Sequence, residues 1–472
     1  MAASIEIPRG EATTGGAEDC PAAKRRDAGR VLRQHCPRSS HAQLGFTTEG
    51  RDVVAMIEAS NEGRVANLIP VRYSRMVESP FAFFRGAAAV QASDLAQSPA
   101  SGIKVQACGD AHLMNFGGFA TPERNLAFDV NDFDETFPAP WEWDVKRLCA
   151  SLVLAARWRG FSTGQAREAA NAAVSRYRER MTVFADMPTM EVWYSRLNLL
   201  DLVAQARGDR RLARLVDRDI RRAQTNSSEH VYGKITATVN GVTRIIDQPP
   251  LLSHPNQDLQ ALGEEFLKQY GVTLREDFRA LLQRFRLVDA ALKVVGVGSV
   301  GTRCYIVLLL GEHNEPLFLQ VKEARRSVLE MHAGPSPWRN QGERVVAGQH
   351  LMQAVSDIFL GWARGPEGRD FYVRQLRDMK IAAEIDQLDA PELALYGRLC
   401  GGALARAHAK AGQSPAIAGY LGASDAFDDA IAKYSLAYAD QIERDYETFR
   451  AAIRSGRLRT ETSALLVETM IA

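Results

Sequence analysis

The chain has 472 residues, enough for two or three parts with cores of their own. Its 58 basic and 57 acidic side chains nearly cancel, so the composition favours neither nucleic acid nor an anionic membrane surface as a partner. No apolar run reaches the ~20 residues that a membrane helix needs, and the N-terminus lacks the pattern of a secretion signal. The six cysteines are scattered without a closely spaced pair, which favours reduced thiols and a cytoplasmic location.

The first half of the chain is predicted to be mostly helical. Residues 1–45 begin acidic and glycine-rich and are expected to form a mostly disordered leader. Helices are predicted over residues 46–100, followed by a strand that breaks into a loop at IKVQACGDAHLMNFGGF and a strand in LAFDVNDFDE. A long helix is predicted after PAPW, and further helices over 165–225. A hairpin at KITATVNGVTRIID and helices over 257–290 complete this part. The hairpin is indicated by Asn240-Gly241, a pair suited to a two-residue turn.

The pattern changes at residue 291. LKVVGVGSVGTRCYIVLLL predicts two strands around a glycine turn, and PLFLQVKEA predicts a third. A helix is expected over residues 341–360, a short strand at FYVRQL, and helices from Pro391 onward.

The glycine turn has the pattern G-x-G-x-x-G at Gly296, Gly298 and Gly301, which by itself is a weak signal. A dinucleotide-binding loop opens into a helix and is followed by an acidic residue about 20 positions later. Here a strand follows, and the residue at that distance after Gly301 is Lys322. Two strands around a glycine turn and a third strand with a lysine are typical of kinases. In that arrangement the glycines let the backbone approach phosphates, and the ammonium neutralises them.

A kinase lysine pairs with a carboxylate on a following helix, and Glu343 follows Lys322 at the start of a predicted helix. The alternative is that both are unrelated surface charges. Ser299 lies within the glycine turn and joins Lys322, Glu343 and the glycines as a nucleotide-binding candidate.

Two acidic segments complete the candidate site. In Gly-Asp-Ala-His-Leu-Met-Asn, Asp110 is expected to accept the proton of an attacking hydroxyl, and Asn115 to bind a metal. Asp132 and Asp134 follow a strand and suit Mg²⁺, which prefers oxygen ligands. Asp129 is a weaker metal candidate, and an acidic surface turn is the alternative interpretation.

These segments resemble a known superfamily. GDAHLMN resembles the catalytic loop of the aminoglycoside phosphotransferase and choline kinase branch of kinase-like proteins, although Cys108 stands where that branch usually has His. NDFDE resembles its metal-binding segment, and PWEWDVKRL resembles the helix whose Trp143 and Asp144 would support the loop from behind. GVGSVG, QVKEA, GERVVAG, YVRQL and CGGALARAHAK resemble the nucleotide lobe, the hinge and the helix that normally precedes the catalytic loop.

The resemblance implies an α+β, kinase-like fold of two lobes in circularly permuted order. The helical lobe would span 46–290 and carry the catalytic and metal-binding loops. A small antiparallel β lobe at 291–380 would bind the nucleotide, and 381–472 would complete the helical lobe. From about residue 45 the chain also resembles a bacterial family of unknown function (domain of unknown function 2252), through segments that include SPFAFFRGAA and DFYVRQLRDMK.

The expected function is transfer of the γ-phosphoryl of ATP to a hydroxyl of a small molecule or protein, with Mg²⁺ as cofactor. Nucleotidyl transfer on the same scaffold and a non-catalytic nucleotide-binding regulator are the alternatives. If the two halves form one site, Asp110 and Asn115 should face Lys322. If they form independent domains, these residues should lie apart.

Overall fold

The computed structural model describes residues 21–198, 228–239, 242–249, 251–254, 259–376 and 381–461. Its α-helices are α1 Pro21–Val31, α2 Val53–Ala59, α3 Ile69–Met76, α4 Pro80–Gly86, α5 Ala88–Leu95, α6 Trp141–Trp158, α7 Thr163–Asp186, α8 Thr189–Tyr194, α11 Ser228–Ile235, α12 Leu259–Thr273, α13 Glu276–Leu282, α14 Glu330–Ala333, α15 Gln341–Met352, α16 Ala390–Lys410, α17 Ser414–Leu421 and α18 Ala426–Arg454.

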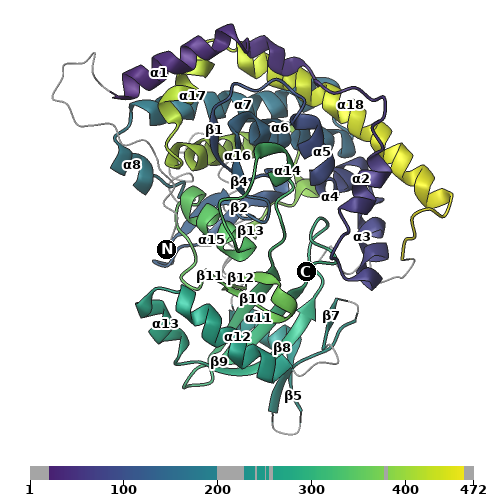
Figure 1. Ribbon diagram of the computed structural model, residues 1–472, viewed down its shortest axis with the longest axis vertical. Coiled ribbons are helices and arrows are strands. Elements are labelled where there is room, and N and C mark those ends of the chain that lie inside the picture. The colour runs from purple at the N-terminus through teal and green to yellow at the C-terminus, as the bar shows by residue number, and fades with distance from the viewer. Residues whose placement is uncertain are drawn as a thin grey trace.

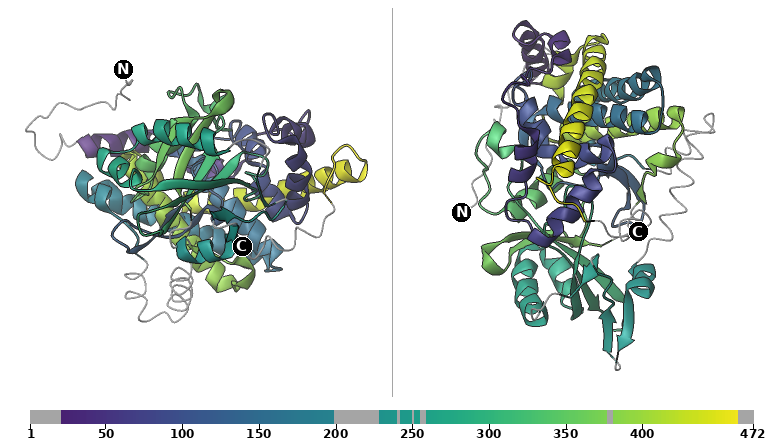
Figure 2. Two further views of the ribbon diagram at one scale, coloured as in Figure 1. Left: turned by 90° about the horizontal axis from the view of Figure 1, so that it is seen from below. Right: turned by 90° about the vertical axis from the view of Figure 1, so that its right-hand side faces the viewer.

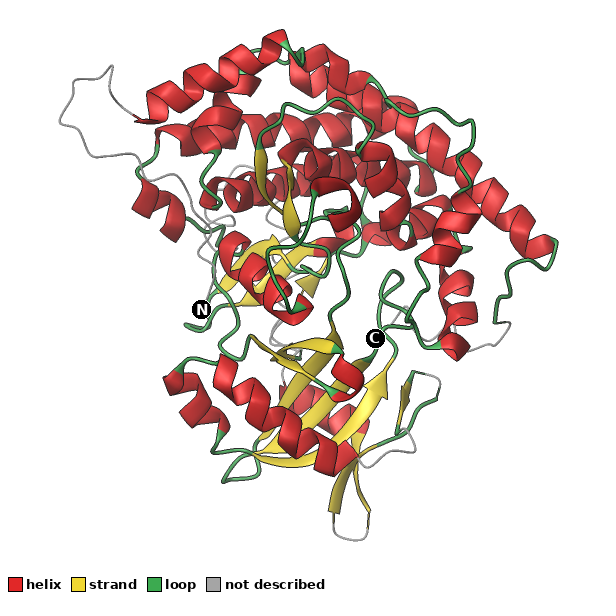
Figure 3. Ribbon diagram, viewed as in Figure 1, coloured by secondary structure: helices red, strands yellow, loops and turns green. Residues whose placement is uncertain are grey.

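The strands form small antiparallel sheets, which confirms the prediction of a mixed chain with antiparallel β-structure. They are β1 Lys104–Ala107, β2 Phe116–Ala120, β3 Leu126–Val130, β4 Phe137–Pro140, β5 Thr236–Val239, β6 Val242–Ile245, β7 Leu252–Ser253, β8 Arg286–Lys293, β9 Cys304–Leu310, β10 Pro316–Glu323, β11 Gly361–Arg364, β12 Asp370–Gln375 and β13 Ile381–Ala382. Most helices gather at one end of the molecule, and the largest sheet lies at the other (Figures 1 and 3).

The largest sheet has six strands in the order β11-β12-β10-β9-β8-β7. Successive side chains of β10 point to opposite faces of the sheet, so the two faces contact different parts of the molecule. Leu317, Leu319 and Val321 pack with residues of α12 and α13 in one core, whereas Gln320 and Lys322 alternate with them and belong to the opposite face. The sheet therefore buries one face under its own helices and turns Lys322 toward the rest of the molecule.

The helical end is built from both halves of the chain. Helices α7 and α16 pack closely, since a methyl group on Gly401 would collide with the carbonyl of Ala173. Helix α18 packs on α6 and α7 and runs along one side of this end, as the turned views show (Figure 2). Segments from the first and last parts of the sequence thus share one core.

Two small sheets carry the loops of interest: the sheet of β1 and β4 lies among the helices, and the sheet of β13, β2 and β3 lies between the helices and the large sheet (Figure 1). Strand β1 pairs with β4, and β2 pairs with both β3 and β13. The loops that follow β1 and β3 carry the acidic residues singled out in the sequence. Pairing of these short strands places the two loops side by side, and a backbone hydrogen bond from Asn131 N to Asn115 O joins them at 2.8 Å.

The predicted disordered leader is wrong for residues 21–45, where α1 and short 3-10 turns form. Helix α1 packs against α17 through glycines: a methyl group on Gly29 would collide with the carbonyl of Ala416, and one on Gly419 with that of Arg26. The side chains of Arg33 and Arg38 donate to carbonyls at the end of α17. Composition missed this because close backbone packing, rather than an apolar face, orders the segment.

Other element boundaries need correction. The strand β8 begins at Arg286, inside the range predicted helical, and α15 ends at Met352 instead of 360. Strand β11 was not predicted. The hairpin is confirmed as β5 and β6, with its turn residues 240–241 outside the described residues, as are 199–225 of the predicted helices and 1–20 of the leader. None of the described helices is long and apolar enough to cross a membrane.

Candidate functional site

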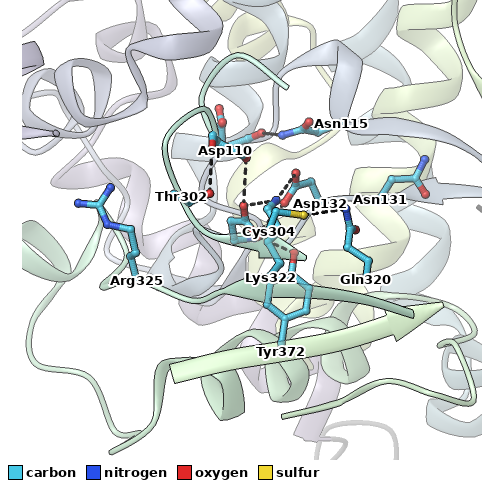
Figure 4. A network of polar contacts seen from close by, with 12 residues as sticks. Asp110, Asn115, Asn131, Asp132, Thr302, Cys304, Gln320, Lys322, Arg325 and Tyr372 are labelled. Carbon is cyan, nitrogen blue, oxygen red and sulfur yellow. Dashed lines mark hydrogen bonds and ion pairs between the residues drawn. The ribbon is translucent and has the colours of Figure 1, made fainter. Parts of the chain in front are cut away.

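Lys322 stands on the sheet face that looks toward the helices. In the register of the sheet it lies opposite Cys304 on β9 and Tyr372 on β12, so these three side chains share one face. Figure 4 shows Lys322 and Tyr372 rising from the strands toward the loops that carry Asp110, Asn115 and Asp132. The structure thus brings the predicted lysine and the predicted acidic loops together.

The loop after β3 supplies two carboxylates to Lys322. Its ammonium forms an ion pair with Asp134 and lies 3.6 Å from Asp132 Oδ2. Asp134 also accepts a 2.7 Å hydrogen bond from the Tyr372 hydroxyl and a longer one, 3.4 Å, from Ser299 Oγ. The backbone N–H of Asp134 donates to Asp132 Oδ1 at 3.1 Å, which turns the two carboxylates toward the same place.

The Lys322 side chain is only 3% exposed. Burial by itself disfavours its charged form, but the attraction of Asp132 and Asp134 outweighs burial and raises the pKa of Lys322 well above its usual value. The lysine therefore remains a cation inside the protein. Removing either side of this arrangement leaves an uncompensated charge.

The loop after β1 holds Asp110 and Asn115. Asn115 ends the 3-10 turn Leu113–Asn115, and its amide donates to the backbone carbonyl of Asp110 at 2.7 Å. Gly109 has φ +84, and a methyl group there would collide with the carbonyl of Glu135. Only glycine accommodates both this backbone and this approach, so the sharp turn before Asp110 is built into the sequence.

Asp144 supports the loop from behind, as expected from the resemblance. Its carboxylate accepts hydrogen bonds from the backbone N–H groups of Cys108 and Gly109 at 2.6 and 2.9 Å. His408 on α16 contacts the same carboxylate at 3.1 Å, and the other nitrogen of its ring lies 2.8 Å from the Tyr177 hydroxyl. The helix CGGALARAHAK therefore reaches the loop in space, although the two segments lie in opposite halves of the sequence.

Arg147 was missed in the sequence and is a main partner of Asp110. One turn after Asp144 on α6, it donates to Asp110 Oδ1 from Nε at 2.8 Å and approaches the same oxygen with Nη2 at 2.7 Å. It also donates to Gln91 and to the Phe84 carbonyl, and it is 3% exposed. The other oxygen, Asp110 Oδ2, faces His112 Nε2 at 3.8 Å. Burial lowers the pKa of His112 to about 4, so this imidazole is neutral near pH 7.

The glycine loop connects β8 to β9 as predicted, and the segment around α3 holds it. Arg75 donates to the Gly296 carbonyl and Arg64 to that of Val300, while the Val65 N–H donates to Gly301 O at 2.8 Å. Gly296 and Gly301 have φ +66 and +87, values that favour glycine.

The predicted pair of Lys322 and Glu343 is replaced by the pairs with Asp132 and Asp134. On α15 the residue that reaches the loops is the next one, Arg344, which donates to the backbone carbonyls of Asp134, Thr136 and Arg325. Glu343 itself lies in the first turn of the helix, where its N–H donates to the Asn340 side chain that caps it. The sequence spacing between Lys322 and Glu343 fits many strand-to-helix crossings and does not fix which side of the helix faces inward.

Asp129 does not fit the weaker metal role proposed for it. Its side chain is fully buried and forms an ion pair with Arg406 on α16. It also accepts from the backbone N–H groups of Val130 and Ala354. These bonds make Asp129 a link between β3, the end of α15 and α16.

The oxygen atoms near Lys322 fit magnesium in part. No three His, Cys, Asp or Glu side chains of the described residues form a group that could hold a metal by themselves. Mg²⁺ in proteins commonly uses only one or two carboxylates and completes its shell with substrate phosphates and water. Asp132 and Asp134 match that kind of incomplete set, and Asn115 as a further ligand stays a prediction.

Sequence reasoning also missed Arg374, which lies on the Lys322 face. It donates to Gln320 at 2.9 Å and to the Asn131 carbonyl at 3.0 Å, so it fastens β12 to the loop after β3. The alternation of Tyr372 and Arg374 in FYVRQL was a usable signal, since both must share a face in a strand.

A family model for an uncharacterised protein conserved in bacteria (DUF2252) matches residues 64–452. The match includes α4, both acidic loops, the glycine loop, Lys322 and α16. Comparison with curated proteins and comparison with solved structures each find no match. Because the match covers most of the chain, the protein belongs to this bacterial family.

Proposed function

We propose that the protein is an ATP-dependent phosphotransferase with a circularly permuted kinase-like fold. One observation carries the proposal: a buried lysine on the middle of a sheet pairs with two carboxylates from a strand-end loop, beside an Asp–Asn loop. Lysine, paired aspartates and an Asp–Asn loop are the parts that phosphoryl transfer needs for charge neutralisation and alignment.

Each side chain would have a distinct role. Lys322 would bind phosphate oxygens, and the glycine loop would hold the phosphates with its backbone N–H groups. Asp110 would orient the acceptor hydroxyl and take its proton through Oδ2, since Arg147 occupies Oδ1. Asn115, Asp132 and Asp134 would hold Mg²⁺, which when bound neutralises phosphate charge.

The permuted order is supported by what surrounds the Asp110 loop. In the kinase-like order, the helix that resembles CGGALARAHAK leads directly into the catalytic loop. Here His408 of that helix contacts Asp144, which in turn holds the loop. Moving the starting point of a chain is tolerated when its ends lie at the surface.

The test uses the purified full chain with ATP labelled separately at the γ- and α-phosphates, Mg²⁺ and a bacterial metabolite extract. We expect the γ-label to move to an acceptor in the wild type and not in Asp110→Asn. Transfer of the α-label instead would show nucleotidyl transfer. Nucleotide binding without transfer of either label would favour a regulator, and no binding at all would refute the proposal.

A further inference from the structure

Helix α4 brings an arginine to the glycine loop. It lies in SPFAFFRGAA, a segment for which the proposed function gives no role. The backbone carbonyl of Arg85, near the end of this helix, is 3.2 Å from where a Cβ on Gly298 would stand. The middle of the G-x-G-x-x-G loop is therefore packed directly on the backbone of Arg85.

The neighbouring arginines all have acceptors. Arg72 bonds to Asn61 and to the Gly86 carbonyl, Arg147 to Asp110, and Arg64 and Arg75 to carbonyls of the glycine loop. Within the described part of the chain, Arg85 differs. Its side chain makes no hydrogen bond and no ion pair to a described residue, and its Nε, like that of Arg72, is sealed from solvent without a partner. Its side-chain contact is the face of Phe81, with the guanidinium carbon 5.9 Å from the ring centre.

Among the residues that the structure describes, none is a direct counter-ion for Arg85. Burial lowers its pKa, and the attraction of Asp110, the strongest favourable influence, only partly offsets this. No ion pair forms with Asp110, whose Oδ1 belongs to Arg147. A buried guanidinium nitrogen without an acceptor costs free energy in folding. A buried polar group without a partner in a native protein is typical of a ligand-binding site.

We propose that Arg85 binds the terminal phosphoryl group of the nucleotide. The inference rests on the proposed function, because it takes the glycine loop and Asp110 as the boundaries of the phosphate site. A guanidinium presents a planar fork that matches two oxygens of a tetrahedral phosphate. The backbone of Arg85 packs on Gly298 and Asp110 attracts its side chain, so Arg85 borders the place proposed for the transferred group. Arg85 would then distinguish nucleotides with a γ-phosphate from those without one.

The test compares Arg85→Met with the wild type by thermal-shift titration with Mg²⁺ and either ADP or a non-hydrolysable ATP analogue. Arg326→Met is the matched control, since Arg326 is exposed and pairs with Glu330. We expect Arg85→Met to lose about 10- to 100-fold of affinity for the ATP analogue, the range for one charge-assisted contact, with ADP affinity unchanged. Because Arg85 Nε has no acceptor in the described part of the chain, the free variant should melt at the same temperature as the wild type or higher.

Other results separate this inference from the proposed function. If Arg85→Met loses affinity for ADP and for the analogue equally, or loses neither, Arg85 does not bind the terminal phosphoryl group. The proposed nucleotide site would not be affected by that result. A lowered melting temperature in both Arg85→Met and Arg85→Lys would show a structural role. If the wild type binds no nucleotide, the proposed function fails. In that case pyrophosphate, titrated against the same pair, shows whether Arg85 still binds an anion.

Discussion

At the scale of single residues, the central feature is the exchange of partners by Asp132 and Asp134. In the protein alone both carboxylates face Lys322, and in the proposed complex they face a metal. Lys322→Met should therefore lower the free energy of unfolding, by about 1–3 kcal/mol because both carboxylates retain some contact with solvent. It should also abolish most stabilisation by Mg·ATP.

The same variant makes a sharper prediction about Mg²⁺ alone. With the ammonium removed, the two carboxylates should bind Mg²⁺ more tightly than in the wild type, since the metal replaces the lost positive charge. Thermal shift at increasing Mg²⁺ measures this, with Lys104→Met as an exposed control. An unchanged response to Mg²⁺, together with full Mg·ATP stabilisation, would remove Lys322 and the carboxylates from the site.

Motif residues could be predicted from the sequence because their chemistry shows in short patterns. Asp110, Asn115, Asp132, Asp134 and Lys322 come together as expected. The arginines that hold the site could not be predicted, since an arginine looks the same whether exposed or buried. Arg147 is important because it contacts Asp110, which lies far from it in sequence. Arg85 is important because its buried Nε has no hydrogen-bond partner among the described residues.

At the scale of elements, strands were predicted well where turn residues bound them, as in β9 and β10. Helix ends were less predictable. Helix α15 ends at Met352 because Gln353 continues in extended backbone and its side chain bonds to the Val130 carbonyl. The ordering of residues 21–45 likewise depends on α17, which lies near the other end of the sequence, and no local pattern contains that information.

The docked N-terminal segment leads to a prediction about pH. His41 is buried in a 3-10 turn with Nε2 2.6 Å from the Tyr420 hydroxyl, and burial, then the charge of Lys146, lower its pKa to about 3. An unfolded histidine titrates near 6.5. His41 therefore contributes stability that is complete above about pH 6.5 and is lost as pH falls toward 3. Near pH 5 the loss should reach about 2 kcal/mol.

Urea unfolding of the wild type and of His41→Gln at about pH 7.5 and pH 5 measures this effect. The difference in unfolding free energy between the two proteins should shrink at the lower pH, because glutamine does not titrate. Trypsin should also cleave the wild type within residues 21–45 faster at the lower pH. A constant difference between the two proteins would show that His41 has the same pKa in the folded and the unfolded chain.

At the scale of the whole molecule, the last helices complete structures that the first half begins. His408 reaches the Asp110 loop through Asp144, and Arg406 pairs with Asp129. Arg406 also donates to the Met352 carbonyl at the end of α15, and α15 packs on β11 and β12 of the large sheet. Arg406 thus connects α16, near the end of the sequence, to a helix that packs on the large sheet.

This arrangement distinguishes one cooperative molecule from two independent domains. Arg406→Met should cost about 3–5 kcal/mol, since it leaves the fully buried Asp129 carboxylate without its cation. Because α15 connects that pair to the large sheet, the helices and the sheet should lose stability together, in a single urea transition followed both by tryptophan fluorescence and by hydrogen exchange of β9 and β10. The double variant Asp129→Asn, Arg406→Met should recover part of the loss, since no buried charge remains. Two transitions, with β9 and β10 as stable as in the wild type, would instead show that the sheet folds independently and would weaken the case for a site shared between the two halves.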